Sequence, residues 1–240
     1  LEDNRTLLEA AVSRLSPLIA PEDVFVVTDA RYAPLVQEVA PQVPAANIIG
    51  EPFGRNTAAA VALMAHAIDR PADEIMVVLP ADPDIRDEEG FRAALTAAAE
   101  RAAEGDLVTL GVEPTEPSTG YGYVRATGEP VQFGGRPTFR VERFEEKPTP
   151  ERARELIASR SAFWNAGIFV WQRSAAIAGL ESYSADISDP IREWCADTSP
   201  SGEAGWPGAA LADTYQDLRD TSIDYALLEP ASLEARVAVV

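Results

Sequence analysis

The chain has 240 residues, 46% of them hydrophobic and 25% charged, which suits one large α/β domain or one domain with a small appendage. Its formal charge of −19 at pH 7 excludes a nucleic-acid surface, because no basic stretch follows a phosphate backbone. Small phosphorylated ligands are not excluded, since a few donors and a divalent ion hold them. No apolar run is long enough to cross a bilayer, so we expect no membrane association. Cys195 is the only cysteine, which rules out an internal disulfide and favours a cytoplasmic location.

The first half of the chain alternates between helix and strand patterns. Thr6-Leu7-Leu8-Glu9 has the form of a capping box and predicts a helix that ends before Pro17. Short apolar runs predict strands buried on both faces, and the segments between them predict helices. The expected strands are residues 24–28, 48–49, 75–79 and 107–110, and the expected helices are residues 32–39, 56–68 and 87–103. This alternation predicts a doubly wound, mostly parallel sheet.

From about residue 120 the pattern changes to glycine-rich, strand-like pieces. These are residues 120–126, 139–144 and 163–171, with one short helix at residues 151–159. They predict a mixed-sheet lobe that binds substrate beside the first half. Residues 199–208 hold Ser, Gly and Pro without periodicity and predict a surface loop.

Both ends of the chain are unusual for this fold class. A doubly wound sheet normally begins with a central strand and its phosphate-binding turn, and neither precedes Thr6. We therefore expect the natural protein to begin before Leu1, and residues 237–240 to end inside a strand. A missing central strand predicts a spacing of about 10 Å between the strands at 24–28 and 75–79, rather than about 4.8 Å.

Leu79-Pro80-Ala81-Asp82 places a carboxylate just after the strongest predicted strand. In open α/β sheets, ligands bind at this edge. Asp82 suits Mg²⁺ bound together with a triphosphate, because magnesium takes one or two carboxylates plus substrate oxygens. The alternative is an aspartate that caps a turn or helix, and Asp84 competes for the role.

Residues 51–57, Glu-Pro-Phe-Gly-Arg-Asn-Thr, follow a predicted strand and open a helix. Gly54 lets a ligand approach the backbone, and Asn56 and Thr57 offer donors at the positive end of the helix. The alternative is an ordinary loop in which Asn56 is the N-cap.

Four segments of the second half carry groups that bind sugars or phosphates. Tyr121 between two glycines suits a flat sugar face, or belongs to a β-turn. Glu146 beside Lys147 offers an acceptor for hydroxyls next to a cation for phosphate, or is a solvated charge run. Asn165 can both donate to and accept from a hydroxyl, or marks the turn into a strand. Residues 222–225 form either part of the site or a helix N-terminus capped by Ser222.

The sequence gives little support for other kinds of catalytic or cofactor-binding site. His66 is the sole histidine and lies in an Ala-rich predicted helix, which argues against histidine acid–base catalysis. No Cys/His cluster indicates zinc, and neither a dinucleotide fingerprint nor a P-loop is present.

The order and spacing of these segments are more specific than any one of them. EPFGRNTAAA, LPAD, GYGYV, FEEKP, WNAGIFVW and SIDYALLE resemble the mannose-1-phosphate guanylyltransferase family over residues 6–240. The resemblance implies the Rossmann-like fold of nucleotide-diphospho-sugar transferases. It also implies attack by the phosphate of mannose 1-phosphate on the α-phosphorus of GTP, with Mg²⁺ and without a protein nucleophile. Positioning and charge neutralisation would then carry the catalysis.

The resemblance also assigns roles to residues. A single domain would have a nucleotide-binding half at residues 1–112 and a sugar-phosphate-binding half at residues 113–240. Asp82 would hold Mg²⁺, and Lys147 would meet the sugar phosphate, so both count as catalytic. The nucleotide would border Gly54, Arg55, Asn56, Thr57, Pro80 and Ala81. The mannose would contact Gly122, Glu146, Asn165, Gly167 and Asp224.

Three departures from the family pattern limit what the resemblance implies. Pro83 stands where the family has histidine, the triphosphate signature expected before Thr6 is absent, and so is a second metal-binding aspartate expected beyond Val240. We therefore expect these 240 residues alone to be inactive. Two alternatives stay open: a nucleotidyltransferase for another sugar or nucleotide, and a non-catalytic sugar-nucleotide-binding regulator. A homodimer is also left open.

Overall fold

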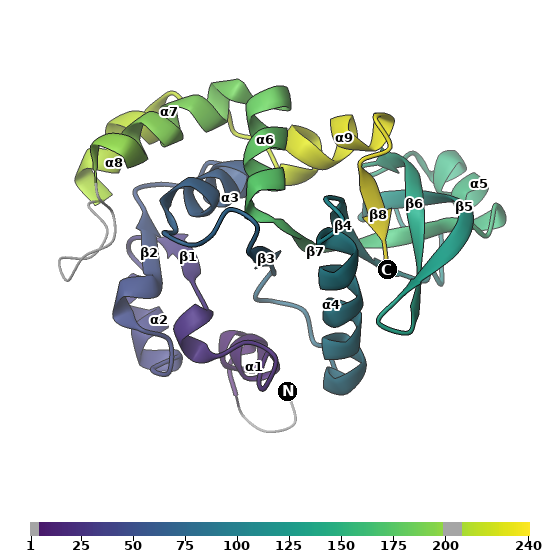
Figure 1. Ribbon diagram of the computed structural model, residues 1–240, viewed down its shortest axis with the longest axis horizontal. Coiled ribbons are helices and arrows are strands. Elements are labelled where there is room, and N and C mark those ends of the chain that lie inside the picture. The colour runs from purple at the N-terminus through teal and green to yellow at the C-terminus, as the bar shows by residue number, and fades with distance from the viewer. Residues whose placement is uncertain (1–4, 199–207) are drawn as a thin grey trace. The chain divides into compact units, whose positions relative to one another are not determined.

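The computed structural model describes residues 5–198 and 208–240 (Figure 1). Most of the surface loop expected at residues 199–208 therefore lies outside the described residues. The chain forms two compact units, each made of separate stretches of sequence. Unit 1 comprises Leu1–Asp69, Pro80–Arg92 and Ala185–Thr221, and unit 2 comprises Arg70–Leu79, Ala93–Ser184 and Ser222–Val240.

Unit 1 contains a two-stranded parallel sheet and a set of helices. Strands β1 (Val26–Asp29) and β2 (Ile48–Glu51) pair with Val26 opposite Ile48. The α-helices of this unit are α1 (Leu7–Ser13), α2 (Ala33–Val39), α3 (Asn56–Ala67), α7 (Ala185–Asp197) and α8 (Gly208–Gln216). Two 3₁₀ turns, η1 (Pro21–Asp23) and η2 (Ala45–Asn47), lead into the strands.

Helix α3 forms the core of unit 1. Its sequence is rich in alanine, and eight of its residues are buried: Ala58, Ala59, Val61, Ala62, Leu63, Met64, Ala65 and Ala67. A helix that is apolar on nearly all sides must be covered on nearly all sides. Helix α7 packs against it, and His66 Nε2 lies 2.9 Å from the Ser188 hydroxyl on α7.

Unit 2 is built on a six-stranded mixed sheet in the order β3-β7-β4-β8-β6-β5. Strand β5 also pairs with β7, so five of the strands close into a ring. The strands are β3 (Ile75–Val78), β4 (Leu107–Val112), β5 (Tyr123–Phe133), β6 (Arg136–Glu145), β7 (Ala162–Gln172) and β8 (Val237–Val239). The helices are most of α4 (Glu88–Ala102), α5 (Pro150–Ala158), α6 (Arg173–Tyr183), the π-helix η3 (Asp224–Leu228) and α9 (Glu229–Leu233).

The predicted α/β class is confirmed, with one parallel and one mixed sheet. Parallel pairing is found between β1 and β2 and between β4 and β8. We expected β3 to pair with a parallel strand, and this prediction is wrong for the pairing that the structure describes. Strand β3 runs antiparallel to β7, with Met76 opposite Trp171. The reason is that β7 comes from the second half of the chain and lies between β3 and β4. The spacing expected between the strands at 24–28 and 75–79 stays a prediction.

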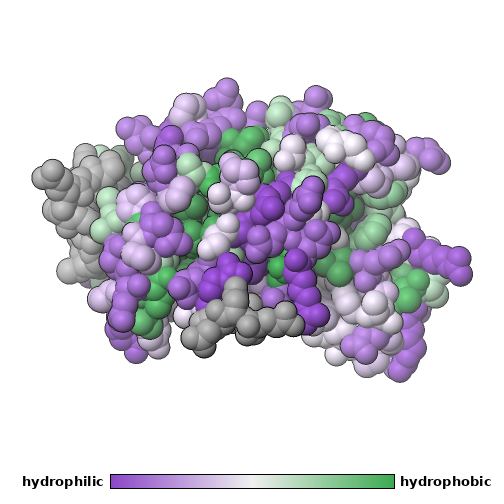
Figure 2. Space-filling view, turned by 90° about the horizontal axis from the view of Figure 1, so that it is seen from below, coloured by the Kyte–Doolittle hydropathy of each residue, from purple (hydrophilic) through white to green (hydrophobic). Residues whose placement is uncertain are grey.

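The surface agrees with the strongly acidic composition. On the face that Figure 2 shows, hydrophilic residues cover much of the surface, with hydrophobic patches between them. In the stretches that the structure describes, none of the helices has the length and apolarity needed to cross a membrane.

The capping box of α1 gives a direct test of the sequence prediction. The Thr6 hydroxyl accepts the Glu9 N–H at 3.1 Å, and the Glu9 carboxylate accepts the Thr6 N–H at 2.7 Å. We expect Thr6→Ala to lower the free energy of unfolding by about 1 kcal/mol, measured by urea denaturation. The control is Ser13→Ala at the other end of the helix, which removes no cap. Equal losses in both variants would contradict the prediction.

Candidate active site

The WNAGIF segment lies inside β7, where that strand bulges. Thr109 of β4 pairs with Phe169, and Gly111 pairs with Asn165, so two steps along β4 match four steps along β7. Gly167 lies in the bulge with φ +68°, a backbone conformation that glycine adopts without strain. The bulge replaces the strand-entry turn that was the alternative interpretation of this segment.

Asn165 joins four segments of unit 2 through hydrogen bonds. Its Oδ1 accepts the Thr109 hydroxyl at 2.7 Å and the Gly167 N–H at 3.2 Å. Its Nδ2 donates to Asp224 Oδ1 at 2.8 Å, and its backbone N–H donates to the Gly122 carbonyl at 2.8 Å. The Gly167 N–H can only donate, so Oδ1 must face it and Nδ2 must face Asp224.

Gly122 leaves room for the Glu146 carboxylate. A Cβ added at Gly122 would collide with Glu146 Oε2 and would lie 3.1 Å from the Phe144 ring. Phe144 is almost fully buried in β6, so it cannot move away easily. The GYGY and FEEKP segments therefore meet at Gly122, and a larger residue there would displace the Glu146 carboxylate.

Lys147 follows β6 and has two unusual features. It is the only lysine in the sequence, and its backbone has φ +45°, in the left-handed region. Its side chain is 64% exposed, and Nζ lies 3.6 Å from Glu146 Oε1. A non-glycine residue held at positive φ costs on the order of 1 kcal/mol.

The two carboxylates of this cluster are poorly solvated. Burial raises the pKa of Glu146, the nearby Asp224 raises it further, and Lys147 opposes both. Burial also raises the pKa of Asp224, although the hydrogen bond from Asn165 stabilises its charged form. Asp224 is the first residue of the π-helix η3, and π-helical turns are frequent at functional sites.

The structure thus brings all six predicted sugar-phosphate residues together within unit 2. They are Gly122, Glu146, Lys147, Asn165, Gly167 and Asp224. The cluster offers one exposed cation, two half-buried carboxylates and one amide, which suits a ligand with a phosphate and several hydroxyls.

In unit 1, Arg55 contacts the protein itself. Its guanidinium donates to the carbonyls of Tyr215 at 2.7 Å and Gln216 at 2.5 Å, at the end of α8. It also lies 5.0 Å from the centre of the Phe53 ring. The structure therefore gives Arg55 an anchoring role, whereas contact with a nucleotide stays a prediction.

The residues on either side of Arg55 are more open. Gly54 is exposed, and a Cβ added there would meet no atom within 4 Å. Asn56 has φ +63° and is the first residue of α3, so it is not the N-cap that the alternative interpretation required. Its Oδ1 accepts the Thr57 N–H at 2.9 Å, and the Ala58 N–H donates to the Thr221 carbonyl at 3.2 Å.

The segment with Pro80, Ala81 and Asp82 follows β3 as an irregular loop. Asp82 is exposed and has no ion pair or side-chain hydrogen bond to any residue that the structure describes. No group of three or more His, Cys, Asp or Glu residues in the described stretches forms a metal cage. A single unpaired carboxylate still fits Mg²⁺, which is often held by one or two carboxylates plus phosphate oxygens.

A buried arginine holds the Asp82 loop. Arg14 is 3% exposed, and its guanidinium donates to the Pro83 carbonyl at 2.9 Å and to the Ala10 carbonyl at 3.1 Å. Burial lowers the pKa of Arg14, and Glu88 and Asp84 oppose that shift. The contact anchors the chain one residue after Asp82.

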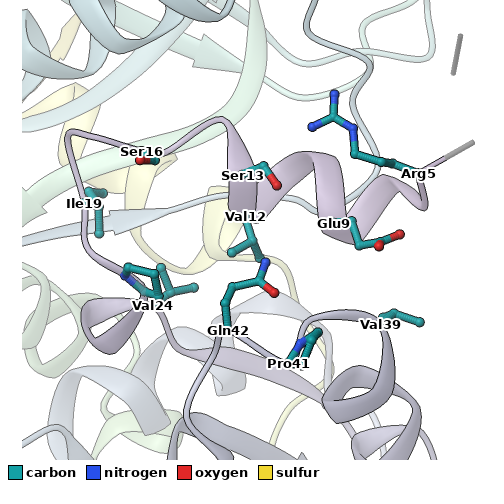
Figure 3. A pocket seen from close by; sticks show the side chains of 11 residues that line it. Arg5, Glu9, Val12, Ser13, Ser16, Ile19, Val24, Val39, Pro41 and Gln42 are labelled. Atoms are coloured by element: carbon teal, nitrogen blue, oxygen red, sulfur yellow. The ribbon is translucent and has the colours of Figure 1, made fainter. Parts of the chain in front are cut away.

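A cavity of about 480 Å³ in unit 1 contains none of the predicted site residues. It lies beside α1 and the segment after α2, with Arg5 and Glu9 at one end and Ile19 and Val24 at the other (Figure 3).

Two residues of these networks were missed by sequence reasoning. Thr109 had a weak signal, as the polar residue in the otherwise apolar run Leu107–Leu110. Arg14 had none, because an arginine on a short helix is ordinarily solvated.

We expect Arg14→Met to lower the free energy of unfolding by about 2 kcal/mol, because it leaves the Pro83 carbonyl without its charged donor. The control is Arg86→Met on the same loop, where the side chain is 91% exposed and pairs weakly with Asp84. Denaturant unfolding should show a small change for the control, and similar losses in both would refute the anchoring role.

The pKa values of Glu146 and Asp224 can be followed by carboxyl ¹³C NMR. Both should titrate above the ordinary values of 4.5 and 3.8. Glu146→Gln should lower the pKa of Asp224 by removing a like charge, whereas Glu142→Gln, next to Arg125, should leave it unchanged.

The same shifts fix the sign of the pH effect on stability. Because both folded-state values are raised, the folded chain binds protons more readily than the unfolded chain. The contribution of the two groups to the free energy of unfolding is therefore most favourable at low pH. This contribution is lost as the pH rises through their folded-state pKa values. An Asp224 that titrates at or below its ordinary value would contradict the prediction.

Comparison with known proteins finds relatives that are similar in sequence and solved structures that are similar in fold. A mannose-1-phosphate guanylyltransferase of Sinorhizobium fredii is 34% identical over 239 residues, which cover 98% of this chain and 45% of that protein. A solved structure described as mannose-1-phosphate geranyltransferase from Thermus thermophilus has a TM-score of 0.84 at 32% identity, covering 99% of this chain and 64% of the other. One described as mannose-6-phosphate isomerase from Helicobacter pylori has a TM-score of 0.82 at 25% identity, covering 100% and 89%.

The chain spans about half the length of the curated relatives it matches. Nucleotidyltransferases of this family typically use a divalent metal ion. The family described as Nucleotidyl transferase matches residues 1–213. With that match over most of its length, the chain belongs to the nucleotidyl transferase family.

Proposed function

We propose that this chain carries the transferase site of a sugar-1-phosphate nucleotidyltransferase, with GTP and mannose 1-phosphate as substrates and GDP-mannose and pyrophosphate as products. The observation that carries the proposal is the cluster of Gly122, Glu146, Lys147, Asn165 and Asp224 in a chain of this family. The sugar and base are chosen because the Sinorhizobium relative is named for mannose 1-phosphate and guanylyl transfer.

The reaction needs no covalent bond to the protein. A phosphate oxygen of the sugar phosphate forms a bond to the α-phosphorus of the nucleotide. The bond from the α-phosphorus to the bridging oxygen breaks, and pyrophosphate leaves with its electron pair. Catalysis of such a displacement rests on positioning and on stabilising charge.

Lys147 is the residue we assign to the sugar phosphate. Its charge is exposed, and its contact with Glu146 at 3.6 Å is too long for a tight ion pair. Its backbone has positive φ, a strained conformation of the kind that clusters at active sites and ligand clamps.

The sugar hydroxyls are assigned to the remaining polar groups of the cluster. Asp224 and Glu146 accept hydrogen bonds when ionised, and the position of Asn165 between Thr109 and Asp224 holds its amide rigid. Gly122 and Gly167 keep side chains out of the space beside these groups.

The nucleotide is assigned to the segments of unit 1. Gly54, Asn56 and Thr57 present exposed backbone and donors at the start of α3, and Pro80 and Ala81 precede the exposed Asp82. Asp82 would hold Mg²⁺, which when bound neutralises charge on the triphosphate. The free thiol of Cys195 supports the cytoplasmic location that we propose with this function.

The test is a substrate matrix with the full-length protein. GTP, ATP, UTP and CTP are each combined with mannose 1-phosphate and glucose 1-phosphate in Mg²⁺, and released pyrophosphate and the sugar nucleotide are quantified. GDP-mannose as the main product supports the proposal. Preference for another pair would identify a different sugar nucleotidyltransferase. Binding of GDP-mannose without turnover would identify a regulator, and both outcomes would overturn the proposal.

The only lysine of the chain allows a sharper prediction. Lys147→Ala should raise the KM for mannose 1-phosphate by about 10- to 100-fold, the range expected for a lost charge-assisted hydrogen bond. Lys147→Gly should raise KM equally without lowering the free energy of unfolding, because glycine relieves the positive φ.

The matched control is Arg143→Ala, which removes an exposed positive charge from the neighbouring strand β6. It should leave KM nearly unchanged. Selective ¹³C-lysine labelling also shows the side-chain signal of Lys147, assigned by its loss in Lys147→Ala, and this signal should shift when mannose 1-phosphate is added. An unchanged KM and an unshifted signal would show that Lys147 is only a solvated charge.

A further inference from the structure

Thr109 is a polar side chain inside an apolar strand. It lies in β4, whose first four residues are all buried, and it is itself 0% exposed. A buried hydroxyl is costly unless it forms hydrogen bonds, so its partners show what it does.

The Thr109 hydroxyl has one proton and two acceptors within reach. Asn165 Oδ1 lies at 2.7 Å and the Ile168 carbonyl at 3.3 Å. The shorter distance assigns the donated bond to Asn165. Both acceptors belong to the bulge of β7, which faces Thr109 across the β4–β7 pair.

Removal of this hydroxyl would change how Asn165 is held. Its Oδ1 would keep only the longer bond from the Gly167 N–H, at 3.2 Å. The amide would then be freer to turn, and its Nδ2 would leave Asp224 Oδ1 for part of the time. Thr109 cannot touch a ligand, because it has no exposed surface.

We propose that Thr109 is a positioning residue for the sugar phosphate: its hydroxyl fixes the Asn165 amide, so that Asn165 and Asp224 face the sugar hydroxyls in one arrangement. The inference rests on the proposed function, and it names a residue outside the predicted site as a determinant of that site.

The kinetic test uses the full-length protein and mannose 1-phosphate. Thr109→Val keeps the shape and removes the hydroxyl, and should raise KM about fivefold with little change in kcat. Thr109→Ser keeps the hydroxyl and should restore most of the affinity. Thr138→Val is the matched control, since Thr138 is equally buried but bonds to the Val131 carbonyl in the β5–β6 hairpin.

A double-mutant comparison separates positioning from general structure. If Thr109 acts through Asn165, then Thr109→Val should have no further effect on KM in an Asn165→Ala background. The same fivefold loss in both backgrounds would overturn the proposal, as would equal losses for Thr109→Val and Thr138→Val.

A readout without substrate keeps the inference separate from the proposed function. The side-chain amide signals of Asn165, assigned by their loss in Asn165→Asp, should shift or broaden in Thr109→Val and stay in place in Thr138→Val. If Thr109→Val does not fold, Thr109→Cys, with its weak thiol donor, replaces it. Absence of turnover in the wild type would refute the proposed function alone, whereas unchanged amide signals would refute the role of Thr109.

Discussion

The side-chain amide of Asn165 is the interaction on which the candidate sugar-phosphate site depends. The amide forms hydrogen bonds with Thr109 in β4, Gly167 in the bulge and Asp224 in the π-helix. The backbone N–H of the same residue donates to the carbonyl of Gly122, just before β5. Gly167 lies two residues from Asn165 in the same strand, whereas Thr109, Gly122 and Asp224 come from other segments of the chain. A half-buried polar network of this kind defines one arrangement only when all its groups are hydrogen-bonded. Each lost hydrogen bond leaves a polar group without a partner, which costs free energy in a poorly solvated site.

Three arginines and the one lysine of the chain have different chemical roles. Arginines join parts of the fold through their planar, multiple donors: Arg152 with Glu145, Arg125 with Glu142, and Arg55 with the end of α8. The one lysine is an exposed point charge beside Glu146. In a chain with a net charge of −19, a phosphate ligand needs a local positive charge that is not held in a tight ion pair within the fold. Burial raises the pKa values of both Glu146 and Asp224, and Lys147 opposes the shift at each.

Most elements were predictable from sequence because their signals are local. The capping box at Thr6 and the apolar run at β3 both lie within a few residues of what they specify. The antiparallel partner of β3 was not predictable, because it depends on β7, about ninety residues later. The candidate site follows the same rule. Its motifs were visible one by one, whereas the Thr109 hydroxyl became meaningful only when the bulge placed it beside Asn165.

Backbone strain gives an independent reason to propose a function for Lys147. Four non-glycine residues in the described stretches have positive φ, and two of them, Asn56 and Lys147, belong to the predicted sites. Gly167 has the same backbone conformation, which glycine adopts without strain. The other two, Arg160 and Ala235, follow the C-caps of α5 and α9, where helices commonly end in this conformation. Helix ends thus account for two of the four positions, and the bond from the Thr57 N–H to the Asn56 side chain accounts for a third. The strain at Lys147 has no such local explanation, and it is the one that supports a functional hypothesis.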